Sequence, residues 1–371
     1  MAEKINIGIL FGGRSCEHEV SVVSARSVLA AIDREKYNVH LVGIDKLGHW
    51  HLATDIEQLV VEKEVLSLPP GGKSSNGLVN LSIHHQGNLS PVSPFSPGAP
   101  ALDVIFPVLH GTFGEDGTIQ GVFEMAGIPY VGCGVAASAI AMDKALAKQV
   151  FSAADIPQAP CRIITRAEWQ KEPSQLLSSL QSNIGFPMFV KPANMGSSVG
   201  VGKATDRQTL QAAIIDALQY DNKVLVEQSM ENCHEVECAV LGNDNPVASV
   251  VGEIIPGAEF YDYQTKYIDD KTETLIPARI SEASSNKVRQ LAIRAFKAID
   301  GAGLSRVDFF VSKDSGEVFL NEINTLPGFT PISMYPQMWA ASGIAYGDLI
   351  DRLVQLAFEQ HQSKASLKRA F

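Results

Sequence analysis

The chain has 371 residues, of which 45% are hydrophobic and 19% are charged, and its formal net charge is −11 at pH 7. This length exceeds one typical domain, so two or three compact units are expected. The negative charge gives no broad attraction to phosphate backbones or anionic lipid, which argues against nucleic acid or a membrane as the partner.

Residues 1–137 predict an open, mostly parallel α/β sheet. Strand and helix patterns alternate through this unit, with strands expected at 5–11, 37–44, 104–109 and 129–131 and helices at 20–32 and 118–126. The stretch 67–100 is crowded with Pro, Gly and Ser. We interpret it as an inserted surface loop or hairpin.

Two α+β units are expected to follow, over 138–223 and 224–371. The first is predicted to contain helices at 138–149, 167–181 and 207–219 and strands at 162–164, 187–191 and 199–203. The second is predicted to contain strands at 224–227, 235–241 and 247–254, a polar aromatic loop at 259–270, a helix at 286–299, a hairpin at 305–324 and a helix at 346–360.

The five cysteines are odd in number and scattered, and none forms a C-x-x-C pair, which is typical of a reducing compartment. The N-terminal residues run directly into a strand pattern, without the apolar core of a signal peptide. No later stretch is apolar for about 20 residues. We therefore expect a cytoplasmic protein.

Two glycine motifs fit other nucleotide-binding folds poorly. The segment 200–203 suggests a P-loop, but that motif needs Gly at Ser197 and Ser or Thr at Ala204. The segment 132–137 has the G-x-G-x-x-A form, yet only Asp155, which leaves a helix, stands near the position of the ribose-binding acid. An NAD-dependent enzyme is therefore a minor alternative.

A third glycine segment, 191–200, joins two predicted strands through small residues whose backbone N–H groups can approach phosphate oxygens. Lys191 adds a positive charge at the end of the first strand. A hairpin turn with an exposed lysine is the competing interpretation. On this segment alone it is the favoured one, because glycines mark turns most often.

The late hairpin carries the strongest chemical signal. Antiparallel pairing about a turn near Ser315 places Asp308 opposite Glu322 and Arg306 opposite Asn324, with all four on one face. Two carboxylates and an amide oxygen suit a hard cation such as Mg²⁺. The opposite, core-side face is expected to carry Val307, Phe309, Val311, Phe319 and Ile323.

A solvated sheet face, with Arg306 neutralising the acids, is the competing interpretation of this hairpin. It leaves the rigid apolar segment 325–330 unexplained. A phosphate loop in one unit and a Mg²⁺ face in the next together describe a nucleotide held between two α+β lobes.

Motifs spread over nearly the whole chain are similar to those of D-alanine:D-alanine ligases. They occur in family order at 11–21, 109–111, 114–117, 142–144, 191–200, 260–263, 266–267 and 321–328. The resemblance implies an ATP-grasp fold and a role in peptidoglycan synthesis. It also implies a two-step reaction, in which ATP phosphorylates the carboxylate of one D-alanine and the amine of a second attacks the acyl phosphate.

The resemblance assigns a cofactor site between the two lobes. The ATP-binding residues it implies are Lys144, Lys191, Gly196, Ser197, Ser198, Glu227, Met230, Glu235 and Lys266. It implies two Mg²⁺ ions, for which Mn²⁺ can substitute, on Asp308, Glu322 and Asn324. Glu322 would bridge the two ions.

The resemblance also assigns the D-alanine subsites. Glu17 would hold the ammonium of the first D-alanine, although on the sequence alone a helix-start carboxylate is the favoured interpretation. Arg306 and the backbone N–H of Gly328 would form an oxyanion hole. Ser333, with the backbone near Met334, would bind the carboxylate of the second D-alanine.

The loop 259–270 resembles the family's lid. Tyr267 would hydrogen-bond Ser197, which in turn would meet Glu17, so that the lid closes over the substrate. His110 would help to orient the substrate, although a lone histidine is often structural.

Three alternatives stay open at this point. The first is a ligase that uses D-lactate or D-serine as its second substrate, and Tyr267 argues against the lactate form because D-lactate-using relatives carry histidine there. The second is a non-catalytic nucleotide sensor, which would not need the metal acids or Arg306. The third is the NAD-dependent enzyme. Family analogy also suggests a homodimer.

Overall fold

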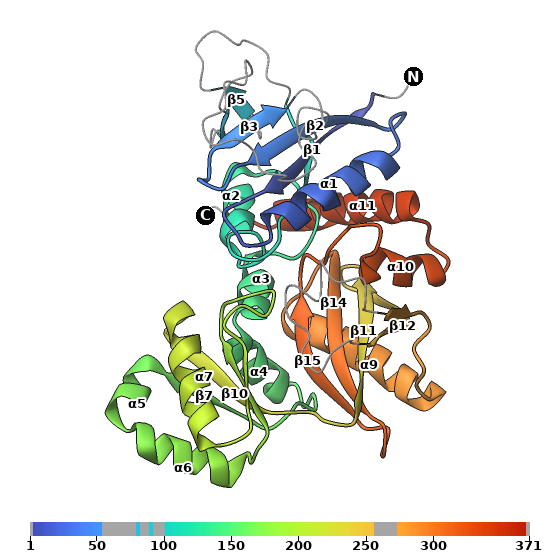
Figure 1. Ribbon diagram of the computed structural model, residues 1–371. Helices are drawn as coiled ribbons and strands as arrows, with labels where there is room; N and C mark the ends of the chain where they lie inside the picture. Colours follow the sequence, from blue (N-terminus) through green and yellow to red (C-terminus); the bar gives the residue numbers. More distant parts are fainter. Residues whose placement is uncertain (1–2, 54–78, 82–88, 92–100, 256–272, 369–371) are drawn as a thin grey trace.

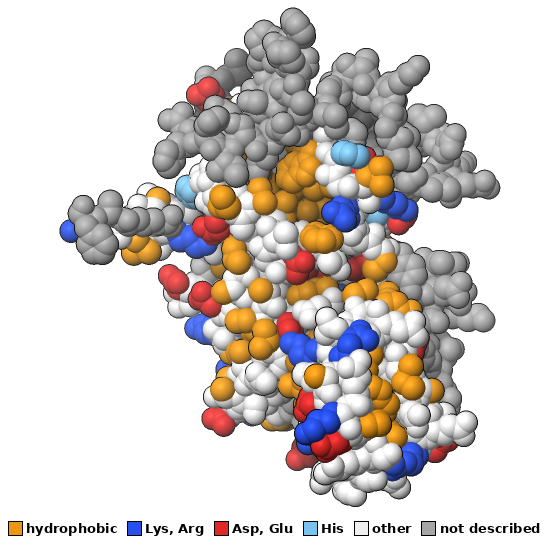
Figure 2. All heavy atoms as spheres, turned by 90° about the vertical axis from the view of Figure 1, so that its left-hand side faces the viewer, with side chains coloured by type: hydrophobic (Ala, Val, Ile, Leu, Met, Phe, Trp, Pro, Cys, Tyr) orange, Lys and Arg blue, Asp and Glu red, His pale blue; other side chains and the backbone are white. Residues whose placement is uncertain are grey.

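The computed structural model describes residues 3–53, 79–81, 89–91, 101–255 and 273–368. The N-terminal sheet lies at the top of Figure 1, and the central unit and the C-terminal sheet lie side by side beneath it. Basic and acidic side chains are interspersed on the face seen in Figure 2. In the described ranges, no helix is both long enough and apolar enough to cross a membrane.

The N-terminal sheet has the expected parallel centre. Its strand order is β3 (Trp50–Ala53), β2 (Tyr37–Ile44), β1 (Ile5–Gly12) and β6 (Val104–Pro107), and β1 runs parallel to both of its neighbours. The described part of this unit contains the helices α1 (His18–Ala31) and α2 (Thr118–Ala126). The strand expected at 129–131 is reduced to one bridge, from Ile105 to Tyr130.

The expected insertion at 67–100 is described only in part. Its described strands are β4 (Val79–Leu81) and β5 (Leu89–Pro91), which pair antiparallel as a hairpin would. The rest of the segment lies outside the described residues, as does the whole expected lid at 259–270.

The central sheet includes a strand that we assigned to the next unit. Its order is β7 (Cys161–Thr165), β10 (Lys223–Gln228), β8 (Met188–Pro192) and β9 (Gly202–Ala204). Because β10 pairs with both β7 and β8, the expected boundary between 223 and 224 is wrong and moves beyond Gln228. Helix α7 (Arg207–Tyr220) matches its prediction closely.

Two helices expected as single elements are each divided. The helix at 167–181 is split into α5 (Arg166–Lys171) and α6 (Pro173–Asn183), because proline cannot donate to the preceding turn. The helix at 138–149 is split into α3 (Val135–Met142) and α4 (Lys144–Ala153). Between them Asp143 is extended, and its carboxylate accepts the N–H groups of Ala145 and Leu146 as the cap of α4.

The C-terminal sheet shares its core with elements from other parts of the chain. Its order is β13 (Glu273–Leu275), β12 (Val247–Ile255), β11 (Cys233–Leu241), β14 (Leu304–Ser312) and β15 (Val318–Asn324). Helix α9 (Glu282–Ala298) covers one face, and Ala141 of α3 and Phe151 of α4 join the same core. Thus α3 and α4 pack with this sheet, although we assigned most of both helices to the central unit.

The last two helices connect the C-terminal sheet to the N-terminal one. They are α10 (Met334–Ala341) and α11 (Tyr346–Ala365). Leu349 and Leu353 of α11 are fully buried in one core with Ile7 and Ile9 of β1. In Figure 1, α11 accordingly runs beside α1 below the N-terminal sheet.

The predicted register of the hairpin is confirmed at its polar end, where Asp308 pairs with Glu322 and Arg306 with Asn324. A bulge then leaves Asn321 unpaired, because Phe309 lies opposite Leu320. The bulge reverses the alternation beyond it, so Val318 and Leu320 are in the core. The assignment of Phe319 to the core face was wrong, and Val307, Phe309, Val311 and Ile323 are buried as expected.

Candidate functional site

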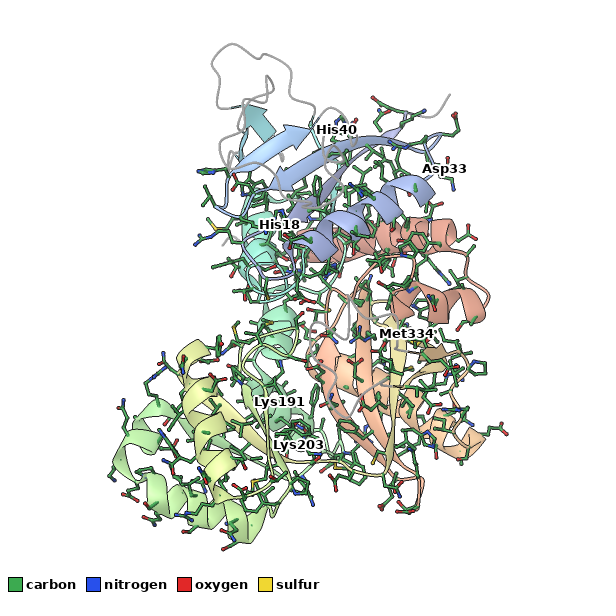
Figure 3. All side chains as sticks on the ribbon, in the orientation of Figure 1. His18, Asp33, His40, Lys191, Lys203 and Met334 are labelled. Carbon is green, nitrogen blue, oxygen red and sulfur yellow. The ribbon has the colours of Figure 1, made fainter. Side chains whose placement is uncertain are left out.

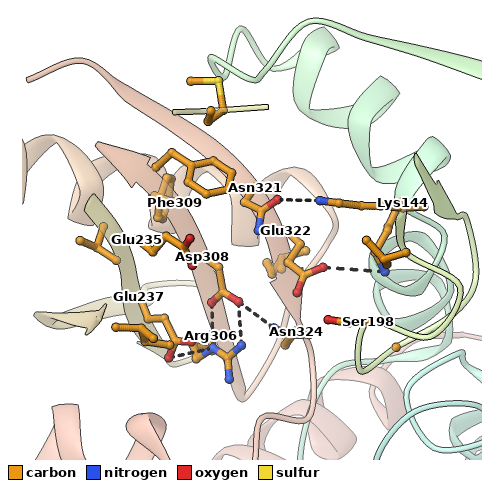
Figure 4. A pocket seen from close by; sticks show the side chains of 18 of the residues that line it. Lys144, Ser198, Glu235, Glu237, Arg306, Asp308, Phe309, Asn321, Glu322 and Asn324 are labelled. Carbon is orange, nitrogen blue, oxygen red and sulfur yellow. Dashed lines mark hydrogen bonds and ion pairs between the residues drawn. The ribbon is translucent and has the colours of Figure 1, made fainter. Parts of the chain in front are cut away.

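The three units meet around a cavity of about 810 Å³, hereafter the central cavity. Its lining includes most of the residues that we singled out from the sequence. They are Glu17, His110, Lys144, Lys191, Gly196, Ser197, Ser198, Glu227, Met230, Glu235, Arg306, Asp308, Glu322, Asn324 and Gly328. Figure 4 shows the part of the cavity between the hairpin and α4.

Two lysines from different elements converge on the polar edge of β15. Lys144 is the first residue of α4, and its Nζ lies 3.7 Å from Glu322 Oε2 and donates to the Met195 carbonyl at 2.8 Å. Lys191 of β8 donates to Asn321 Oδ1 at 3.4 Å. The bulge that exposes Asn321 therefore provides a contact that the sequence did not reveal (Figures 3 and 4).

Lys191 also forms an ion pair with Glu227, whose other oxygen lies 3.1 Å from Lys148 Nζ. Burial alone would raise the pKa of Glu227, but the two lysines lower it to about 2. Burial likewise opposes the charge of Lys191, and Glu227 reverses this effect, so the pKa of Lys191 is raised. We missed Lys148, although it stands one turn after Lys144 on the same helix face.

Glu227→Gln should destabilise the protein by about 3 kcal/mol at pH 7, because it leaves two lysines without their shared counter-ion. The native pKa of Glu227 is lowered from 4.5 to about 2. Its stabilising contribution is therefore complete above about pH 4.5 and is lost as the pH falls toward 2. Urea unfolding of both proteins from pH 7 to pH 3 should show the difference shrinking, and a constant difference would contradict this account.

The glycine segment forms a tight loop against Glu17. Ser197 and Ser198 both have positive φ angles, of 51° and 59°. A Cβ placed on Gly196 would lie 3.2 Å from Glu17 Oε2, so this carboxylate meets the loop at Gly196. The Ser197 hydroxyl is buried and has no hydrogen-bond partner among the described residues, so the expected bond to Glu17 is not made. Its other expected partner, Tyr267, lies outside the described residues, as does Lys266 of the expected ATP site.

A second acid, which we did not predict, stands beside Glu17. A Cβ on Gly111 would lie 2.7 Å from Glu17 Oε2, while the Gly111 N–H donates to Glu115 Oε2 at 2.8 Å. Burial, together with the charge of Glu17, raises the pKa of Glu115 to about 8. The two acids flank one glycine, and Glu17, which meets the loop at Gly196, is the one placed to contact a cationic ligand such as an ammonium group. Glu115 lies within the quoted motif 114–117, but spacing alone did not distinguish it.

Arg306 is held by acids from two strands. Its Nε and terminal nitrogen donate to the two oxygens of Asp308 at 2.7 and 2.6 Å, and Nε lies 3.1 Å from Glu237 Oε2. Glu237 stands opposite Asp308 on β11 and was not predicted. Burial would lower the pKa of Arg306, but these two carboxylates raise it. Arg306 is therefore a fixed cation at the floor of the cavity.

The polar end of the hairpin has the donor set of a hard-cation site. Asp308 and Glu322 are directly paired, and Asn324 Nδ2 donates to Asp308 Oδ2 at 3.2 Å, which leaves the Asn324 amide oxygen available. Glu235 adds a further acid on β11, and burial raises the pKa of its carboxyl. Two carboxylates and an amide oxygen fit Mg²⁺ or Mn²⁺.

The other expected subsite residues differ in exposure to the cavity. His110 is buried, and its two ring nitrogens contact Ser24 Oγ at 3.1 Å and the Leu326 carbonyl at 3.0 Å. Gly328 lines the cavity, whereas Ser333 and Met334 do not. The Ser333 hydroxyl lies behind Gly328 and accepts the Thr330 N–H at 2.9 Å. The Met334 side chain is buried in the core at the start of α10 (Figure 3).

Both halves of the chain match known proteins. Residues 6–133 match the family model described as D-ala D-ala ligase N-terminus, and residues 150–355 match D-ala D-ala ligase C-terminus. A D-alanine--D-alanine ligase of Ruminiclostridium cellulolyticum is 50% identical over 370 residues, covering 97% of this chain and 96% of that one. One of Bacillus cytotoxicus is 46% identical over 365 residues, covering 98% and 99%.

Solved structures show the same similarity. The D-alanine-D-alanine ligase from Coxiella burnetii superimposes with a TM-score of 0.84 at 35% identity, covering 98% of this chain and 97% of that one. The VanG D-Ala:D-Ser ligase from Enterococcus faecalis gives the same TM-score and identity, covering 96% and 100%.

Proposed function

The chain belongs to the D-alanine–D-alanine ligase family and joins two D-alanine molecules with ATP through D-alanyl phosphate, and from this premise we propose which residues of the central cavity serve each step. The product serves peptidoglycan synthesis. The observation that carries the proposal is the convergence on one cavity of Glu17, the two lysines Lys144 and Lys191, and the Arg306 to Asn324 face of the hairpin.

ATP lies between the central sheet and the hairpin, with its phosphates on Lys144 and Lys191 beneath the loop 196–198. Lys148 supports this role of Lys191, because it keeps Glu227 neutralised when Lys191 turns to a phosphate. The nucleoside end is bounded by Glu227 and Met230 and by Glu235, a carboxylate suited to ribose hydroxyls. Lys266, in the expected lid, would be the remaining ATP-binding residue.

Asp308, Glu322 and Asn324 would hold Mg²⁺, two ions with Glu322 between them, and Mn²⁺ would be accepted by the same oxygens. When bound, the metal neutralises the charge that develops on the transferred phosphoryl group. The residues of the chain hold the nucleotide and the first carboxylate in line for that transfer.

Glu17 accepts the ammonium of the first D-alanine. Glu115, on the other side of Gly111, has a raised pKa and holds the site through the hydrogen bonds that it accepts from the Gly111 and Leu326 N–H groups. Arg306 and the Gly328 N–H face the carbonyl oxygen on which negative charge develops when the second amine attacks. Ser333 would assist the second carboxylate, together with the backbone near Met334. Tyr267 would close the lid, and family analogy also supports a homodimer.

Incubation of the protein with ATP, Mg²⁺ and D-alanine should yield ADP, phosphate and D-alanyl-D-alanine, with no turnover of L-alanine. The contact of the ammonium with Glu17 and that of the carboxyl with Arg306 hold two substituents of the carbon between them, and the space left for the methyl group then selects one handedness. Product masses from a panel of D-alanine, L-alanine, D-serine and D-lactate provide the test. Equal use of L-alanine would contradict the subsites, and a dominant D-alanyl-D-serine product would identify the activity named for the Enterococcus relative.

A further inference from the structure

The segment 326–329, which carries Gly328, is anchored by side chains of the N-terminal unit. We propose that Ser24 of α1, acting through His110, is a positioning residue for the Gly328 N–H in the second step of the reaction. This inference rests on the oxyanion role proposed above for Gly328.

The anchor is a closed chain of hydrogen bonds. The Leu326 carbonyl can only accept, so His110 Nδ1 carries the proton and donates to it at 3.0 Å. The other ring nitrogen, Nε2, makes a hydrogen bond with the Ser24 hydroxyl at 3.1 Å. The same hydroxyl oxygen accepts the Phe329 N–H at 3.3 Å. The chain thus holds the segment at both sides of Gly328.

Burial makes these bonds hard to replace. Ser24 is 0% exposed and His110 is 5% exposed, so bulk water does not reach the groups that a broken bond would leave unpaired. Neighbouring groups hold the same peptides from other directions. Glu115 accepts the Leu326 N–H, and the Tyr346 hydroxyl donates to the Phe329 carbonyl at 2.7 Å.

A separate contact also holds the segment in place, so Ser24 matters for the geometry of the segment more than for folding. The ring of Phe329 packs edge-on against Phe106, with centroids 5.7 Å apart, so the segment stays docked without Ser24. What the Ser24–His110 chain adds is the orientation of the peptides on either side of Gly328. A backbone donor that is displaced or rotated loses much of its stabilisation of a developing oxyanion.

Ser21 offers a matched control on the same helix. It is also 0% exposed and also makes two hydrogen bonds, accepting the Gly12 N–H at 2.8 Å and donating to the Val108 carbonyl. Its partners lie at the ends of β1 and β6 and do not include the Gly328 segment. Ser21→Ala therefore removes an equivalent buried hydroxyl without releasing that segment.

Ser24→Ala should lower kcat for D-alanyl-D-alanine by about tenfold or more, with the KM for ATP changed less than about twofold. Ser21→Ala should keep kcat within about twofold of native, although it should lower the thermal midpoint by about as much as Ser24→Ala does. Binding of a phosphinate analogue of the dipeptide, whose tetrahedral phosphorus imitates the second-step intermediate, should weaken in Ser24→Ala by a factor close to the loss in kcat. ADP binding should not change.

Ser24→Cys provides a near-isosteric second variant if the alanine variant does not fold. A thiol is a weak donor and acceptor, so an intermediate fall in kcat is expected. The proposal is overturned if Ser24→Ala, or Ser24→Cys in its place, keeps native kcat, or if Ser21→Ala loses as much kcat as the Ser24 variant does. A native protein that makes no dipeptide at all would instead overturn the proposed function.

Discussion

Glu322→Gln is expected to abolish ligation, by more than about 10²-fold in kcat, while leaving the fold intact. The Glu322 side chain is 33% exposed at the edge of β15, faces Asp308 across the strand pair and lies near Lys144. The exchange is nearly isosteric and removes only the negative charge that two cations would share. The test is to measure the turnover of the variant and the native protein over a range of Mg²⁺ concentrations. The thermal midpoint shows whether the variant is folded.

Glu317→Gln is the matched control for this exchange. Glu317 is an exposed acid on the same hairpin, near its turn, where its carboxylate accepts the Ser315 hydroxyl at 3.2 Å. Its variant should keep native turnover. Binding of Mn²⁺ with ADP, followed by the paramagnetic signal of the ion, should weaken in Glu322→Gln and not in Glu317→Gln. Native activity of Glu322→Gln at ordinary Mg²⁺ would mean that the hairpin is a solvated face.

Local rules were sufficient to predict the chemistry of the hairpin. Period-two alternation and a turn near Ser315 predicted that Asp308 faces Glu322, and the structure has this pairing. The same rules failed past Asn321, because a bulge shifts the alternation by one residue and no single residue type announces it. Phe319 was misassigned for this reason, and Asn321 was not recognised as a partner of Lys191.

Local rules could not predict the contacts between segments that are distant in the sequence. Strand β10 looked like the start of a new unit, because nothing near residue 224 shows that its partners are β7 and β8. Glu237 and Glu115 look like ordinary acids until pairing across β11 and β14, and the turn at Gly111, bring them to Arg306 and Glu17. The motifs of the resemblance identified the site residues, but they did not show that Ser333 lies behind Gly328 and outside the cavity lining.

The second large effect is expected for Arg306→Ala, which should lower kcat by about 10²-fold or more and change the KM for ATP far less. Arg306 is 13% exposed in its side chain, and two acids fix its position and its charge. Charge that develops on the substrate oxygen in the second step meets a cation that is already oriented. Lys144 and Lys191, which we propose bind the ATP phosphates, stand on other elements and contact Glu322, Asn321 and Glu227.

Arg306→Ala also leaves Asp308 and Glu237 without their cation, so a second variant must separate catalysis from charge repulsion. Glu237→Gln added to Arg306→Ala should restore part of the lost thermal stability, since it removes one of the two negative charges that Arg306 balances in the native protein, and should leave kcat low. Arg289→Ala, an exposed arginine of α9 that donates to the Ala248 carbonyl at 3.0 Å, is the control and should keep native kinetics. If the double variant recovers kcat together with stability, the loss of kcat in Arg306→Ala came from repulsion between the Asp308 and Glu237 carboxylates. If the loss in Arg306→Ala is confined to ATP binding, Arg306 serves the nucleotide and the oxyanion assignment is wrong.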